Sequence, residues 1–174
     1  METITTPVTT TPVALRYGML TGLVSILFSF GLSIMHQESS PARYISFAIL
    51  IGGIVFAMNT FKQQNQGFMS YGQGLGIGTV LSAVVGLMSG IFTYVYMTFI
   101  DTEIMGRITE KMRTDMEARG GMTDEQIDQA IAMSGKFMHG PFMLVFALLG
   151  SILIGVLLSL VISAFIKNAQ PEFE

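Results

Sequence analysis

The stretch that decides the fold is YGQGLGIGTVLSAVVGLMSG, which runs from Tyr71 to Gly90. It holds six glycines in twenty residues, and it contains neither a charged residue nor a proline. In water, a glycine inside a helix costs about 1 kcal/mol relative to alanine, so backbone propensity alone favours a loop. The other residues are mostly large and aliphatic, which is unusual for a loop. The stretch is therefore expected to be ordered in a solvent that is itself apolar.

The composition of the whole chain identifies that solvent as lipid. Half of the residues are hydrophobic (51%) and only 12% are charged, whereas soluble domains carry about 25% charged residues. Apolar runs of about 18 or more residues with few charges are typical of membrane-spanning helices. Four intervals contain no charged residue between their ends: Arg16 to Glu38, Arg43 to Lys62, Lys62 to Asp101 and Lys136 to Lys167. The sequence therefore predicts an integral membrane protein.

Four apolar segments are long enough to cross a bilayer, and they predict an all-α membrane protein with four transmembrane helices. The expected spans are residues 13–35, 44–61, 71–100 and 142–166, within a membrane domain of residues 13–166. As a helix, the third span is about 45 Å long against a hydrocarbon core of about 30 Å, so it tilts or protrudes. Residues 1–12 are expected to form a mobile Thr/Pro-rich tail, and residues 167–174 a short C-terminal tail.

A polar segment, residues 101–140, separates the third span from the fourth and predicts an αα-hairpin outside the membrane. Gly120 and Gly121 are expected to end its first helix, and Thr123 with Gln126 begins the second as a capping box. The segment carries eight acidic and five basic side chains. Its first helix has an apolar face of Ile104, Ile108, Met112 and Met116. Charge pairs four residues apart support that helix, at Glu103–Arg107, Arg113–Glu117 and Asp115–Arg119.

Small residues recur every four positions in the third and fourth spans. Positions four apart lie above one another on a helix, so each set forms a smooth stripe on one face. In lipid, such stripes let two helix backbones approach closely. The stripe of the third span is Gly74, Gly78, Ser82, Gly86 and Gly90, and that of the fourth is Ser151, Gly155, Ser159 and Ser163. The first span has two shorter sets. One is Gly18 and Gly22, and the other is Ser25, Ser29 and Ser33.

Two interpretations of these stripes stay open. In the favoured one, the third span packs against the fourth or the first within one chain, because a bundle must be built from some contact. In the other, the stripe is a seam between copies of the chain. Val80 and Val84 lie off the stripe, and we expect a slightly larger side chain there to be nearly neutral.

The chain offers little that catalysis or metal binding requires. It has no cysteine, which removes disulfides, thiol catalysis and Cys-based zinc sites. His36 is interpreted as a solvated histidine in the first turn. His139 lies among Met133, Met138 and Met143, a set that soft metals such as copper use, but methionine is more often a packing residue. We therefore expect no catalytic residue, no metal and no cofactor.

The most unusual polar residue within a span is Gln73, near the start of the glycine-rich helix. Its amide is expected to bond a neighbouring helix or lipid headgroups, and lining a permeation path is the alternative. Asn59 and Thr60, near the end of the second span, lie at a similar depth on the same side. They are the expected partners of Gln73.

Several motifs resemble those of a known family. They are GFMSYGQGLGIGTVLS from Gly67, TYVYMTFID from Thr93 and MTDEQIDQA from Met122, followed by a last apolar span that ends in Lys167. In these motifs the chain is similar to a family of small four-helix bacterial membrane proteins catalogued as a domain of unknown function. The resemblance implies the fold and the location, and it implies no catalytic residue or substrate.

Two functional classes remain. The first is a structural or interaction protein, a scaffold or accessory protein that presents the acidic hairpin; it is favoured because the spans hold almost no ionisable residue. The alternative is a small-solute or ion pore or carrier formed by an oligomer. An enzyme is not expected. The expected partners are the lipid bilayer and either copies of the chain or other membrane proteins, and the net charge of −3 does not suit nucleic acid.

The expected location is the bacterial inner membrane, with both termini in the cytoplasm. Arg16, Lys62 and Lys167 flank the terminal side, where the positive-inside rule places the cytoplasm. Arg43 and the five basic residues of the hairpin argue for the reverse orientation. The hairpin is discounted in part because acids alternate with its basic residues.

Overall fold

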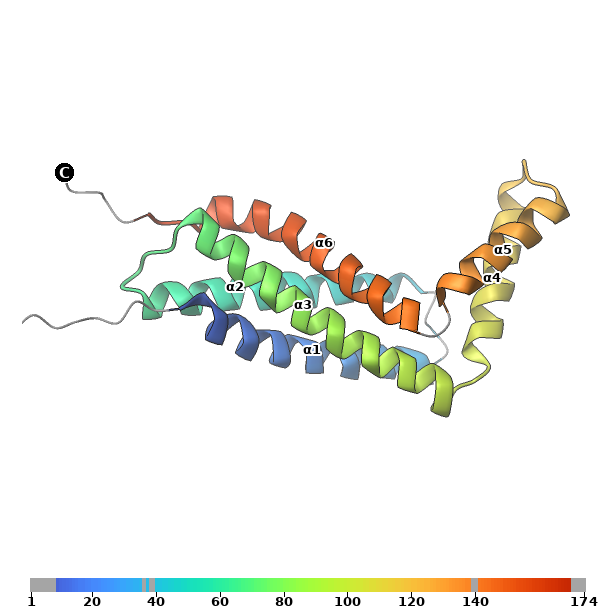
Figure 1. The fold of residues 1–174 in the computed structure, drawn as a ribbon, viewed down its shortest axis with the longest axis horizontal. Helices are drawn as coiled ribbons and strands as arrows, with labels where there is room; N and C mark the ends of the chain where they lie inside the picture. The colour runs from blue at the N-terminus through green and yellow to red at the C-terminus, as the bar shows by residue number, and fades with distance from the viewer. Residues whose placement is uncertain (1–8, 36, 38–39, 139–140, 170–174) are drawn as a thin grey trace, which may run out of the picture.

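A computed structural model describes residues 9–35, 37, 40–138 and 141–169 of the chain. Within these residues the fold is all-helical, with one isolated β-bridge between Met69 and Asn168 (Figure 1). The elements are α1 (Thr10–Ile34), the 3₁₀ turn η1 (Pro41–Tyr44), α2 (Ile45–Gln64), α3 (Tyr71–Val95), the π-helical turn η2 (Tyr96–Ile100), α4 (Ile104–Arg119), α5 (Asp124–Met138) and α6 (Pro141–Ile166).

Four of the described helices are long and apolar enough to cross a membrane, which makes the chain a multi-pass membrane protein. They are Thr10–Ile34, Ile45–Gln64, Tyr71–Ile100 and Phe142–Ile166. The all-α class and the four spans predicted from the sequence are therefore confirmed, with ends that differ by three residues at most. Residues 1–8 of the predicted N-terminal tail, 170–174 of the C-terminal tail, His36 and His139 lie outside the described residues.

Helix α3 begins where a capping box supplies the partners that its first backbone amides lack. The Ser70 hydroxyl accepts a bond from the Gln73 backbone N–H at 3.2 Å, and the Gln73 side-chain oxygen accepts from the Ser70 N–H at 2.8 Å. From there the glycine-rich stretch is helical throughout. A lipid solvent offers the backbone no other hydrogen-bond partner, so the glycines do not break the helix.

Helix α3 is the central element of the bundle. It packs most extensively against α6 and α1, while α2 packs mainly against α1 (Figure 1). The buried core occupies the half of the bundle nearer the chain termini. Its members come from the start of α1, from α2, from the connection ahead of α3 and from α3 as far as Val85. They are Val13, Ala14, Leu50, Ile54, Ala57, Met58, Phe61, Met69, Ile77, Leu81 and Val85.

The terminal end of the bundle is closed by polar contacts between its loops and helix ends. Met69 and Asn168 exchange two backbone hydrogen bonds, of 2.8 and 2.9 Å. The Lys62 ammonium donates to the Ile166 carbonyl at 3.0 Å, where the last carbonyls of α6 lack helical partners. These contacts join the α2–α3 connection to the end of α6.

The opposite end of α3 is widened by the π-helical turn η2, which the sequence pattern did not predict. Tyr96 at its start is buried and stacks on Phe92, with ring centroids 5.9 Å apart. Phe30 of α1 meets both rings edge-on, at 6.1 and 6.0 Å. The Asp101 N–H bonds the Tyr96 carbonyl at 2.9 Å and ends the turn. Beyond Asp101, the chain turns into α4.

Candidate functional site: the α3–α6 seam and the α4–α5 hairpin

The structure brings the two predicted stripes of small residues together in one antiparallel seam. Because the two helices run in opposite directions, a residue four positions later in α3 faces a residue four positions earlier in α6. One member of every pair is a glycine, so two side chains never compete for the same space. The pairs are Gly74 with Ser163, Gly78 with Ser159, Ser82 with Gly155, Gly86 with Ser151, and Gly90 with Ala147.

The seam has no room for an added side chain over most of its length. A Cβ at Gly78 would overlap the Ser159 side chain, and one at Gly155 would overlap Ser82. At Gly86 it would lie 2.5 Å from the Cβ of Ser151. Gly90 differs, because its added Cβ would lie 3.4 Å from the nearest atoms of Ala147 and Leu144. Contact is therefore tightest at the middle of α3 and looser towards the hairpin end.

Few hydrogen bonds reinforce the seam, so close packing is its main interaction. Ser151 donates to the backbone carbonyl of Ser82 at 2.7 Å. The hydroxyls of Ser82 and Ser159 are buried and have no hydrogen-bond partner among the described residues. At the terminal end, Tyr71 donates to the Leu160 carbonyl at 3.2 Å.

A second close contact joins α3 to α1. An added Cβ at Gly18 would lie 2.9 Å from the Cβ of Val84, and one at Gly22 would lie 2.9 Å from the Met88 sulfur. Val84 is therefore not the neutral position that its place off the stripe suggests. Of the three α1 serines, Ser25 is buried whereas Ser29 is exposed, which shows that they do not share one environment.

The expected contact of Gln73 with Asn59 and Thr60 is replaced by other bonds. The Gln73 oxygen is taken by the capping box, because the first N–H groups of a helix need acceptors. Thr60 bonds the Tyr17 hydroxyl at 2.7 Å and so joins α2 to α1. Asn59 is exposed. The positions of these residues along the sequence could not show which hydrogen-bond partner each side chain would reach.

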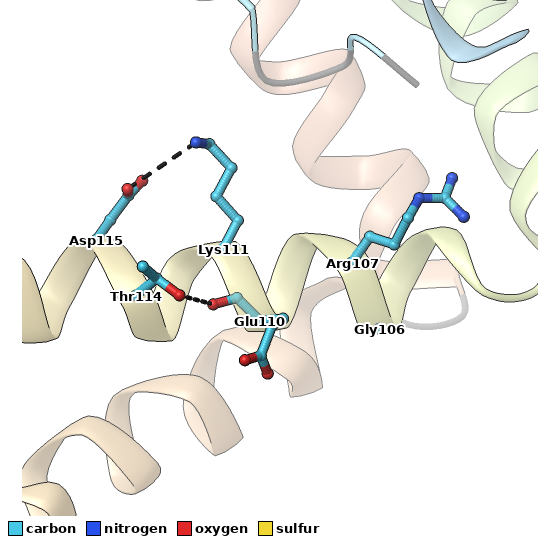
Figure 2. Close-up of a pocket in the computed structure, with 6 residues that line it drawn as sticks. All are labelled: Gly106, Arg107, Glu110, Lys111, Thr114 and Asp115. Atoms are coloured by element: carbon cyan, nitrogen blue, oxygen red, sulfur yellow. Dashed lines mark hydrogen bonds and ion pairs between the residues drawn. The ribbon is translucent and has the colours of Figure 1, made fainter. Parts of the chain in front are cut away.

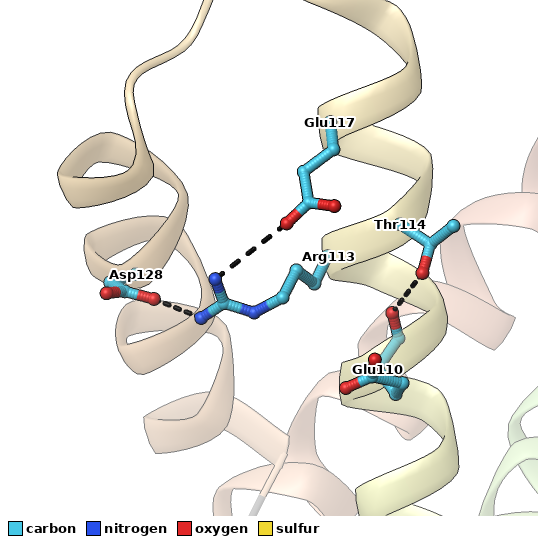
Figure 3. A network of polar contacts seen from close by, with 5 residues as sticks. All are labelled: Glu110, Arg113, Thr114, Glu117 and Asp128. Atoms are coloured by element: carbon cyan, nitrogen blue, oxygen red, sulfur yellow. Dashed lines mark hydrogen bonds and ion pairs between the residues drawn. The ribbon is translucent and has the colours of Figure 1, made fainter.

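Helices α4 and α5 form an antiparallel pair beyond the end of the bundle, and the pair runs across the bundle axis (Figure 1). Arg113 of α4 holds the pair together, because its guanidinium lies between Glu117 of its own helix and Asp128 of α5 (Figure 3). The bond to Asp128 raises the pKa of Arg113 above its ordinary value. Ile127 of α5 is buried beside these charges. The capping box of Thr123 and Gln126 is present, with bonds of 3.0 and 3.4 Å.

A salt bridge fixes the junction between η2 and α4. The Arg107 guanidinium donates to both carboxylate oxygens of Asp101, at 3.2 and 2.6 Å. This side-chain hydrogen bond is the main reason that the pKa of Asp101 lies below its ordinary value. A two-pronged bond restricts rotation more than a single one does. Arg107 and Asp101 therefore help to set the direction in which the hairpin leaves the membrane span.

One side of α4 carries a shallow groove of about 540 Å³. Arg107, Lys111 and Asp115 point to the same side of the helix, and Lys111 lies 4.0 Å from Asp115 (Figure 2). Glu110 points elsewhere, and its backbone carbonyl accepts from the Thr114 hydroxyl at 3.0 Å. Of the charged side chains on this side, Lys111 pairs with Asp115 within α4, and Arg107 pairs with Asp101 ahead of the helix.

The described residues contain no group of three or more His, Cys, Asp or Glu side chains that could hold a metal ion. Of the methionines near His139, Met133 is exposed on α5. Met143 lines an apolar pocket of about 380 Å³ with Phe137 and Phe146, whose rings meet edge-on at 5.3 Å. This pocket lies between the end of α5 and the start of α6.

Comparison with known proteins adds a family and no activity. No curated protein and no solved structure matches the chain. A family model described as a protein of unknown function, DUF4199, matches residues 16–168. The matched region begins in the first turns of α1 and ends at Asn168, so it includes the hairpin and all of the bundle except the start of α1. The chain therefore belongs to the DUF4199 family.

Proposed function

We propose that the protein is a membrane-anchored interaction protein, a scaffold or accessory protein without enzymatic activity. Its four-span bundle holds the α4–α5 hairpin at the membrane surface, where the hairpin binds other membrane or envelope proteins. Its partners on this proposal are the bilayer and proteins, not nucleic acid, and no cofactor takes part. The alternative of an oligomeric pore or carrier has less support, since the tightest helix seam is closed within one chain.

The observation that carries the proposal is the fixed placement of a charged hairpin across the bundle axis (Figure 1). The Asp101–Arg107 and Arg113–Asp128 ion pairs hold it in place at its base and its middle. Rigid presentation lowers the ordering cost that binding must overcome. The face left free includes exposed Asp124 and Glu125. Large exposed apolar side chains accompany them, at Met122 (53% exposed) and Met133 (65%).

The mixture of acids and exposed methionines indicates the chemistry of the partner. Methionine side chains adapt to different apolar surfaces, and carboxylates attract basic ones. We therefore infer a protein segment that is basic and partly apolar. On this proposal the protein lies in the bacterial inner membrane with its termini in the cytoplasm, so the partner segment lies on the opposite side.

Site-specific crosslinking in native membranes tests the proposal. A photoreactive residue is placed at Gln129, exposed on α5, and at Leu157, which is 55% exposed on the lipid-facing side of α6. We expect a discrete protein adduct from Gln129 that is lost when Glu125→Lys reverses the nearby charge. Adducts that contain only copies of this chain, together with solute flux through reconstituted vesicles, would favour the oligomeric pore.

A further inference from the structure

A groove lined by serines opens in the hairpin half of the bundle, next to the buried core, whose Leu50 and Val85 form part of its wall. Its volume is about 410 Å³, and its walls come from α1, α2, α3 and α6. At this end of α2, Ile45 and Phe47 are exposed, whereas the buried residues of the helix begin at Leu50. The helices that meet closely at the terminal end thus leave a space between them at the other.

Five serines line this groove: Ser25, Ser29, Ser46, Ser89 and Ser151. Ser151 uses its proton in the bond to the Ser82 carbonyl. Within the described part of the chain, the other four make no side-chain hydrogen bond. Ser25 is the most informative, because it is only 8% exposed and still has no partner. Its oxygen can be reached from the groove, whose other walls are apolar, so an acceptor inside the groove would give it a hydrogen bond that hydrocarbon cannot.

The remaining lining defines what kind of molecule would bring that acceptor. None of the described residues that line the groove is charged, which disfavours an ionic ligand. Leu50, Val85 and Ile154 form apolar walls. Phe47 and Phe146 at the rim are 43% and 53% exposed, so the groove is open towards the hydrocarbon of the bilayer. A ligand would therefore enter from the membrane and would be uncharged.

We propose that the groove binds the glycerol-ester head of an uncharged diacylglycerol-type lipid. Such a head offers two ester carbonyls and one hydroxyl, which can satisfy several of the four free serine hydroxyls at once. Its acyl chains would lie against the apolar walls and leave through the open rim. This inference is independent of what the hairpin binds, because the groove is built from the four spans alone.

The absence of cysteine from the native chain gives a clean chemical test. Ser25→Cys is introduced into the full-length protein in phosphatidylcholine nanodiscs, and its alkylation by membrane-permeant N-ethylmaleimide is followed with and without dioleoylglycerol. Leu27→Cys, on the same helix at a side chain that is 69% exposed, is the matched control. We expect dioleoylglycerol to slow alkylation severalfold at Ser25→Cys and to leave Leu27→Cys unchanged. Ser89→Cys is a second reporter if the first variant does not fold.

Three results would overturn the proposal. The first is alkylation that dioleoylglycerol does not slow at either groove cysteine, and the second is equal slowing at Leu27→Cys. The third is rapid modification of a groove cysteine by a charged, membrane-impermeant methanethiosulfonate, which would mean that water fills the groove. Removing hydroxyls gives an independent check: Ser25→Ala and Ser89→Ala should each weaken dioleoylglycerol binding about three- to tenfold, the loss of one neutral hydrogen bond.

Discussion

At the scale of single residues, the distance between helix backbones decides which glycines are replaceable. Gly76 and Gly78 belong to the same helix and differ by two positions. A Cβ at Gly78 would overlap Ser159, whereas one at Gly76 would meet nothing within 4 Å. The requirement for glycine thus comes from the neighbouring helix, since both residues have ordinary helical backbone angles.

Gly78→Leu and Gly86→Leu are expected to destabilise the bundle, because each new side chain would push α6 away from α3. Forcing extra methylenes into a filled core typically costs about 1–3 kcal/mol. Gly76→Leu is the matched control and should be near neutral. Thermal unfolding in detergent measures all three. Equal losses at Gly76 and Gly78 would contradict a close α3–α6 contact.

Gly90→Ala should cost clearly less than Gly78→Ala. The added methyl at Gly90 would lie 3.4 Å from Ala147 and Leu144, which small side-chain movements can accommodate. At Gly78 the same methyl would collide with Ser159. The same unfolding assay distinguishes them. If Gly90→Ala were the more damaging change, the seam would be tightest at the hairpin end and not at the middle of α3.

At the scale of elements, the hairpin keeps its direction through a few ion pairs. An ion pair between Arg113 and Asp128 joins α4 to α5, and one between Arg107 and Asp101 joins α4 to the residue that follows η2. Both pairs are partly exposed, so salt should weaken them. The spans depend instead on packing in lipid. The two parts of the protein are therefore expected to respond differently to pH and ionic strength.

The Asp101–Arg107 bond should make the base of the hairpin sensitive to acid. The bond lowers the pKa of Asp101 in the folded protein, so its stabilisation is fully present above the unfolded value near 3.8. It is lost as the pH falls through the lower folded pKa, because the protonated carboxyl no longer pairs with Arg107. The protection factors at the start of α4, which correct for the slower intrinsic exchange of amides in acid, should therefore fall at low pH. In Asp101→Asn the exchange should already be fast at neutral pH, and an unchanged rate would contradict a structural role for the pair.

The Arg113–Asp128 bond should couple α4 to α5. In a double-mutant cycle, Arg113→Ala and Asp128→Ala should show a favourable interaction in the exchange protection of α5, and high salt should reduce it. The pair Lys111–Asp115 is the control, because it lies within α4 and is longer, at 4.0 Å. Equal coupling at both pairs would mean that Arg113 does not join the two helices.

At the scale of the whole molecule, both ends of the described chain lie at the same end of the bundle (Figure 1). An even number of spans requires this arrangement. Reporter fusions ahead of α1 and after α6 should therefore report the same compartment. Fusions that report opposite compartments would contradict the four-span topology. A reporter in the Gly120–Gly121 turn should report the other side, and it would also test the proposed orientation.

The sequence by itself determined that the chain lies in lipid, and the lipid environment determined which segments form helices. Charge-free intervals of membrane length gave four helices whose ends agree closely with the structure, because a backbone in lipid must satisfy its own hydrogen bonds. The capping box at Thr123 was predictable because its two partners, Thr123 and Gln126, are only three residues apart in the sequence. The four-residue spacing of Gly74 to Gly90 also showed that one face of α3 is smooth.

Only the tertiary structure decided which helix covers that face and in what register. Gly78 opposite Ser159 and Ser82 opposite Gly155 are pairs between distant segments, and periodicity within one helix cannot choose among partners of similar composition. The same holds for Val84 against Gly18, for Thr60 against Tyr17 and for Arg113 against Asp128. The serine groove arises where α2 separates from its neighbours at the hairpin end. The physical reason is the same in each case: local chemistry fixes a helix and its faces, but contact between faces depends on how the whole set of helices packs.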